Sequence, residues 1–119
     1  MRDPKGWPKP SLGKERLLEE RIARFQAEKR RMFGAPVWFV RGNMFAGVFA
    51  DGIFARFSEE DRKEIGAEDG EKFEPVEGRV MKEYMVMPEA MLGNKGTMDE
   101  WLDRSFAYVS RLPEKKRKR

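Results

Sequence analysis

Three short apolar runs, separated by pairs of turn residues, constrain the fold of this chain more than any other sequence feature. The first run, residues 37–40, is β-branched and aromatic, and Gly42-Asn43 separates it from a second run over residues 44–49. Asp51-Gly52 suits the positive φ angles of a two-residue hairpin loop, and a third run follows at residues 53–57. The pattern therefore predicts a three-stranded antiparallel meander.

The segment before the meander has the spacing of an amphipathic helix. Residues 14–31 contain no Gly or Pro, and Leu18, Ile22 and Phe25 recur at helical spacing between charged side chains. An apolar sheet face needs a covering layer, so we expect this stripe to pack on the sheet rather than on a membrane or a partner.

Two more helices are predicted after the meander. The sequence Ser58-Glu59-Glu60-Asp61 supplies an N-cap hydroxyl and an acidic first turn for a short helix over residues 59–65. Thr97-Met98-Asp99-Glu100 has the form of a capping box, and Pro113 ends the helix that this box starts. Trp101 lies on the apolar face of that last helix, so we expect it to anchor the helix on the sheet.

Extended segments between these helices complete the predicted fold. Residues 73–75 and 79–87 have the pattern of two further strands. The predicted class is α+β, an antiparallel sheet with packed helices in the order α-β-β-β-α-β-β-α. We interpret Gly47 and the five methionines between residues 81 and 98 as packing residues rather than as parts of a binding surface.

Charge is distributed unevenly along the chain. Residues 1–31 hold ten Lys/Arg against five Asp/Glu, and residues 111–119 hold six against one, whereas residues 32–110 hold nine against fifteen. The net charge of +4 therefore belongs to the ends of the chain. Together with the Pro- and Gly-rich start, this distribution predicts three parts. They are a disordered N-terminal tail at 1–13, a folded domain at 14–113 and a basic C-terminal tail at 114–119.

The basic tails indicate nucleic acid as one candidate partner. We expect weak, non-specific contact with DNA or RNA through a group of C-terminal cations: Lys115, Lys116, Arg117, Lys118 and Arg119. The alternative is that the tails only aid solubility. A second class of function is a protein-interaction module without a nucleic-acid role, in which the sheet binds a protein partner or forms a homodimer.

Composition argues against most enzyme mechanisms. The chain has no Cys and no His, which excludes thiolate nucleophiles and removes the commonest general base and transition-metal ligand. We therefore expect no catalytic residue, no metal site and no cofactor. Lys82, Glu83 and Tyr84, on a predicted strand, form the most chemically suggestive cluster, but a structural ion pair is the favoured interpretation. Four acids lack the spacing of a calcium loop: Asp51, Glu74, Glu77 and Glu83.

The sequence contains no feature typical of membrane insertion or secretion. No run approaches the roughly 18 consecutive apolar residues of a membrane span. The first residues lack the apolar region of a secretory signal. We therefore expect a cytoplasmic protein with no membrane partner.

Five segments, in order along residues 16–114, resemble the N-terminal domain of TfoX-like proteins. They are Met32-Phe33-Gly34, Gly42-Asn43-Met44-Phe45-Ala46-Gly47, Phe73-Glu74-Pro75, Gly78-Arg79-Val80-Met81-Lys82-Glu83-Tyr84 and Trp101-Leu102-Asp103-Arg104-Ser105. The resemblance implies a fold similar to YjbR-like proteins, an antiparallel sheet with packed helices. It also implies a regulatory or adaptor role without established enzymatic activity, since TfoX is regarded as a regulator of natural competence genes. TfoX carries a second, C-terminal domain that has no counterpart in this sequence.

Overall fold

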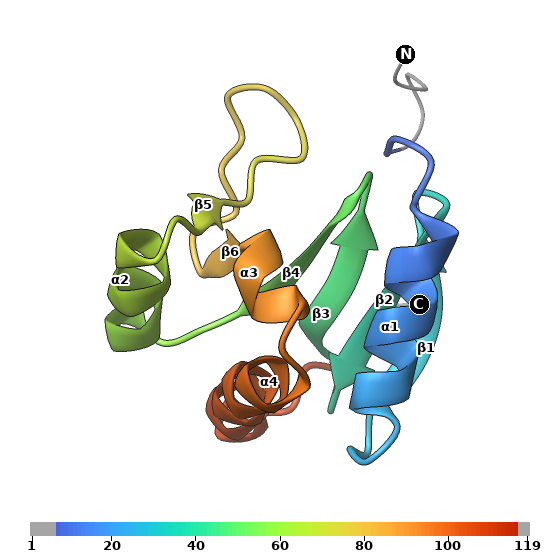
Figure 1. Ribbon diagram of the computed structural model, residues 1–119. Coiled ribbons are helices and arrows are strands. Elements are labelled where there is room, and N and C mark those ends of the chain that lie inside the picture. Colours follow the sequence, from blue (N-terminus) through green and yellow to red (C-terminus); the bar gives the residue numbers. More distant parts are fainter. Residues whose placement is uncertain (1–6, 117–119) are drawn as a thin grey trace.

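A six-stranded antiparallel sheet with strand order β1-β2-β3-β4-β6-β5 forms the centre of the protein (Figure 1). The computed structural model describes residues 7–116 of the 119-residue chain. The strands are β1 (Glu28–Met32), β2 (Ala35–Val40), β3 (Asn43–Phe49), β4 (Gly52–Arg56), β5 (Glu71–Lys72) and β6 (Tyr84–Val86). The helices are α1 (Leu12–Ile22), α2 (Glu59–Ala67), α3 (Glu89–Leu92) and α4 (Lys95–Ser110). The predicted α+β class is confirmed, and strand β1 and helix α3 are additions to the predicted order.

The predicted meander corresponds to β2, β3 and β4. In the first hairpin turn, Arg41 and Gly42 both have positive φ angles, 51° and 83°. In the second, the loop residues are Ala50 and Asp51, and Ala50 has a φ of 54°. The prediction of an Asp51-Gly52 loop is wrong by one residue, because Gly52 already pairs within the sheet.

Gly47 lets strand β3 pass beneath an aromatic ring of β4. A Cβ atom at this position would lie 2.7 Å from Phe54 Cζ and 3.1 Å from the Pro36 carbonyl oxygen. Non-bonded carbon atoms prefer separations of about 3.5–4.0 Å, so the site accommodates glycine without displacing its neighbours. The interpretation of Gly47 as a packing residue is confirmed.

Residues 28–32 form a strand, which corrects the prediction of a single helix over 14–31. Helix propensities differ by less than about 1 kcal/mol per residue. The hydrogen bonds that residues 28–32 form with the open edge of β2 outweigh this small preference for a helix. The alternation of a strand then separates the charges onto two faces. Lys29 and Arg31 point towards helix α1, where each lies 2.9 Å from the Glu15 carboxylate.

The starts of two helices follow local capping chemistry. Ser58 Oγ accepts a hydrogen bond from the Asp61 backbone N–H at 3.2 Å, which confirms the predicted start of α2. The capping box predicted at Thr97 is wrong, because Asn94 Oδ1 accepts from the Thr97 backbone N–H at 3.0 Å and α4 begins at Lys95. None of the helices within residues 7–116 has the length and apolar character needed to cross a membrane.

Helices α1 and α4 pack on one face of the sheet, and α2 and α3 add Ile65, Met91 and Leu92 to the core that they enclose (Figure 1). Trp101 is 5% exposed and meets the Phe57 ring edge-on, with ring centroids 6.0 Å apart. The predicted anchoring role of Trp101 agrees with this position. Four methionines are buried in the same core, as expected: Met85, Met87, Met91 and Met98.

The opposite face of the sheet is covered by two irregular segments, one of which belongs to the expected N-terminal tail. Trp7 is 8% exposed, and Ser11 caps helix α1. The prediction of a disordered tail over 1–13 is therefore wrong for residues 7–13, while residues 1–6 lie outside the described part of the chain. The Trp7 ring centroid lies 5.2–5.9 Å from those of Phe33, Phe49, Phe54 and Phe73.

Residues 73–83 form the second irregular segment, which corrects the two strands predicted at 73–75 and 79–87. Phe73 is buried and holds the start of the segment on the sheet. Gly78 then has a φ of 82°, and its backbone N–H donates to Glu74 Oε2 at 2.6 Å. Phe73 and Met81 pack on the sheet, but the turn between them carries the chain off it, so only the last part of the predicted strand pairs with β4.

Candidate nucleic-acid interface

Arg41, in the turn between β2 and β3, binds the end of helix α4 and the segment that follows it. Its guanidinium NH1 donates to the carbonyl oxygens of Ser110 and Leu112, at 3.4 Å and 3.3 Å. The Arg41 carbonyl accepts from the Lys115 backbone N–H at 2.9 Å. The last carbonyls of a helix lack intrahelical donors and carry partial negative charge, so a cation is stabilised at this position.

Gly42 and Asn43 complete the attachment of the C-terminal segment. Asn43 is buried, and its amide donates to the Pro113 carbonyl at 3.0 Å. Gly42 has a positive φ, and a Cβ atom there would lie 1.8 Å from the Lys115 carbonyl oxygen. Glycine is therefore required for the segment to lie on the turn. The sequence pattern predicted a turn at these residues but did not predict this contact.

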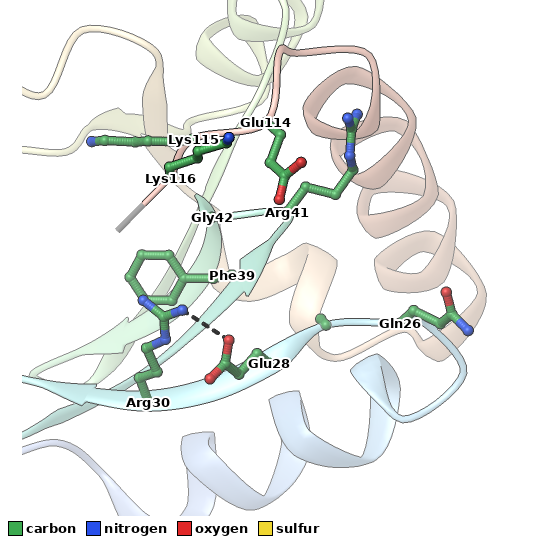
Figure 2. Close-up of a pocket in the computed structure, with 10 residues that line it drawn as sticks. Gln26, Glu28, Arg30, Phe39, Arg41, Gly42, Glu114, Lys115 and Lys116 are labelled. Carbon is green, nitrogen blue, oxygen red and sulfur yellow. Dashed lines mark hydrogen bonds and ion pairs between the residues drawn. The ribbon is translucent and has the colours of Figure 1, made fainter. Parts of the chain in front are cut away.

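The attached segment forms one wall of a broad groove beside strands β1 and β2 (Figure 2). The groove has a volume of about 1380 Å³. Its lining is rich in charge and contains one phenylalanine, Phe39, which is half-buried. The charged residues that line it are Arg30, Arg41, Lys115, Lys116, Glu28 and Glu114.

Arg30 and Phe39 form a cation–π pair on the sheet side of the groove. The register of β1 and β2 places Glu28 opposite Phe39, and Arg30 follows on the same face of the sheet. The guanidinium carbon of Arg30 lies 4.6 Å from the centroid of the Phe39 ring, and Arg30 NH2 lies 2.8 Å from Glu28 Oε1. The hydrogen bond with Glu28 raises the pKa of Arg30 above its ordinary value, so the guanidinium remains charged.

The structure brings part of the predicted tail together with cations of the folded domain. Lys115 and Lys116 lie in the groove, and both are exposed. Sequence reasoning missed Arg30 and Arg41, because a charge summed along the chain does not show which cations the fold gathers. The alternation of side chains along a strand puts Arg30 on the same face as Glu28. This signal could be used only after residues 28–32 had been recognised as a strand. The other predicted contact residues lie outside the described part of the chain: Arg117, Lys118 and Arg119.

The predicted cluster of Lys82, Glu83 and Tyr84 does not line the groove. Lys82 is exposed in the turn before β6, and the ion pair of Glu83 is with Arg56, whose Nε lies 2.7 Å from Glu83 Oε1. Burial opposes the ionisation of Glu83, but the hydrogen bond and charge of Arg56 outweigh it, so the pKa of Glu83 lies below its ordinary value. Burial raises the pKa of Tyr84 to about 12, and its hydroxyl donates to the Met44 carbonyl at 3.2 Å. These contacts tie β6 and the residue before it to β3 and β4.

Three of the four acidic residues that lack the spacing of a calcium loop, Asp51, Glu74 and Glu83, have separate partners. Asp51 lies 3.6 Å from Lys14 Nζ, and Glu74 accepts from a backbone N–H within its own loop. Within residues 7–116, no three Asp or Glu side chains form a group suited to hold a metal ion.

The fold and the groove together define a small α+β domain with a basic surface groove. The TfoX N-terminal domain family model matches residues 22–108, and the chain belongs to this family. None of the curated proteins and none of the solved structures matches the chain. The matched range includes Arg30, Phe39 and Arg41, whereas Lys115 and Lys116 follow its end.

Proposed function

We propose that this chain is a non-enzymatic regulatory or adaptor domain of the cytoplasm that binds nucleic acid weakly and without sequence preference. The observation that carries the proposal is the attachment of the C-terminal segment to Arg41, which sets Lys115 and Lys116 across the groove from Arg30. Clustered cations bind phosphate groups without reading base sequence. The regulatory or adaptor role rests on membership of the TfoX N-terminal domain family.

Acidic residues limit the affinity that such a groove can reach. Glu28 and Glu114 belong to its lining, and Glu28 is paired with Arg30. Residues 32–110 also hold fifteen Asp/Glu against nine Lys/Arg, and this excess repels phosphate. We therefore expect binding at low salt that fades near physiological salt.

Fluorescence anisotropy with a labelled DNA duplex at several salt concentrations tests this function. With the groove cations Arg30, Lys115 and Lys116 engaged, the logarithm of affinity should fall with the logarithm of salt with a slope of about −3 or steeper. A chain ending at Glu114 should bind more weakly and with a shallower slope. Lys63→Ala, at an exposed position on α2, is the control and should leave binding unchanged. No binding by the intact chain at low salt, or unchanged affinity after truncation, would contradict the proposal.

A second candidate function is a protein-interaction module, which the position of β1 favours. Strand β1 forms one edge of the sheet, so one side of its backbone is open to pairing with another strand. Light scattering over a range of concentrations measures self-association, and affinity capture after nuclease treatment separates protein partners from nucleic-acid bridging. Protein partners retained after nuclease treatment, or a concentration-dependent dimer, would support this module. Loss of every partner on nuclease treatment would favour nucleic-acid binding.

A further inference from the structure

The Arg30–Phe39 pair gives the groove a surface that phosphate binding alone does not use. We propose that the groove binds a single strand of nucleic acid, whose bases stack on the Arg30–Phe39 pair while its phosphates contact Lys115 and Lys116. This inference rests on the proposed nucleic-acid binding and specifies the form of the nucleic acid.

The planar group of Arg30 is oriented before any ligand arrives. Its guanidinium carbon lies 4.6 Å from the Phe39 ring centroid on one side, and Glu28 Oε1 accepts from its NH2 at 2.8 Å. Guanidinium planes and aromatic rings are the surfaces on which proteins stack unpaired bases. The bases of a duplex cover one another's faces, so only an unpaired base can extend this stack. The pair therefore favours a single strand over a duplex.

The cations on the opposite wall are placed to contact the backbone of the same strand. Figure 2 shows Arg30 and Phe39 on the sheet side of the groove and the segment that bears Lys115 and Lys116 on the other side. Arg41 acts as a positioning residue, because its guanidinium donates to the helix carbonyls and its own carbonyl holds Lys115. A strand lying in the groove would thus meet a stacking surface along one side and ammonium groups along the other.

The size of the groove also fits a polymer better than a small ligand. Its volume of about 1380 Å³ exceeds the roughly 300–1,000 Å³ typical of small-molecule sites. Open single-strand-binding surfaces contact about 4–16 nucleotides per domain. A segment of several nucleotides is therefore the occupant that the groove accommodates.

Anisotropy at low salt with two probes tests the inference: a labelled oligothymidylate of about 12 nucleotides and a duplex of the same length. The intact protein should bind the single strand several-fold more tightly than the duplex. Arg30→Lys keeps the charge and removes the planar group, so it should weaken single-strand binding by about fivefold or more. Duplex binding should stay within about twofold, because the phosphate contacts keep their charge. Phe39→Leu, which retains apolar packing, should show the same selective loss.

The controls separate this inference from the proposed function on which it rests. Lys63→Ala should leave both affinities unchanged, and circular dichroism melts should show that both groove variants are folded. Equal affinity of the intact protein for strand and duplex, or an equal loss for both probes in the variants, would overturn the single-strand proposal and leave nucleic-acid binding in place. Single-strand affinity that is unchanged in both variants would overturn it as well. Absence of binding to either probe would overturn both.

Discussion

Gly42→Ala should detach the C-terminal segment from the domain, and Gly34→Ala provides the matched control. Both glycines have positive φ angles, 83° at Gly42 and 85° at Gly34. A Cβ atom at Gly42 would lie 1.8 Å from the Lys115 carbonyl oxygen, whereas one at Gly34 would meet nothing within 4 Å. The two substitutions therefore share the same backbone strain and differ only in the collision with the segment.

The expected loss of stability follows from these two contributions. An L-residue in the left-handed region costs about 1–2 kcal/mol, and this is the expected effect of Gly34→Ala. In Gly42→Ala the segment must also move, which breaks the hydrogen bonds from the Lys115 backbone and the Asn43 amide. At about 1 kcal/mol for each hydrogen bond, the total loss for Gly42→Ala is about 3–4 kcal/mol.

Urea unfolding measures the free energy of unfolding of both variants, and its slope against urea concentration should be unchanged. A chain ending at Glu114 lacks Lys115 and so has no collision at residue 42. In that background, Gly42→Ala and Gly34→Ala should cost the same, which completes a double-mutant cycle. Equal losses in the full-length chain would refute the attachment of the segment to the turn, and with it the structural basis of the groove.

Two further predictions concern the core and the ion pairs of the buried Glu15 on α1. Trp101→Ala and Trp7→Ala should each lower the free energy of unfolding by about 3–5 kcal/mol, because both rings are buried among other aromatic rings. A urea midpoint shift worth less than about 1 kcal/mol would place that tryptophan outside the core. The hydrogen bond from Lys29 lowers the pKa of Glu15 below its ordinary value of 4.5. The Glu15 carboxylate therefore stabilises the fold above that pH. This contribution disappears as the pH falls through the lower pKa of the folded state. Glu15→Gln should therefore reduce the acid-dependent loss of stability between about pH 5 and pH 3, and identical pH profiles for the two proteins would contradict this expectation.

The parts of the fold that were predicted correctly depend on interactions between neighbours in the chain. The meander follows from apolar runs and turn residues that lie within a few positions of one another. The start of α2 follows from Ser58, whose hydroxyl accepts from a backbone N–H three residues on. The start of α4 was misplaced because Asn94 and Thr97 are both acceptable caps, and local sequence does not decide between them.

The candidate site was predicted only in part, for a related reason. Lys115 and Lys116 were singled out by the local density of positive charge. Arg30 belongs to a run of three cations, Lys29-Arg30-Arg31, that was assigned to a helix, and Arg41 is an isolated cation. Only the folded chain brings both residues to the same groove. The cation–π partner of Arg30, Phe39, lies on the neighbouring strand, so this contact depends on the register of β1 and β2.

The α+β class, the central meander, the buried anchor at Trp101 and the absence of His and Cys could all be read from the amino-acid sequence. These properties depend on composition and on periodicity within single segments. Three features became evident only in the folded chain: residues 28–32 are a strand, Trp7 belongs to the core, and Lys115 and Lys116 line the same groove as Arg30. Each of these outcomes depends on a contact between segments far apart in the chain. The free energy of such a contact depends on its distant partner, and the pattern of either segment alone does not contain that partner.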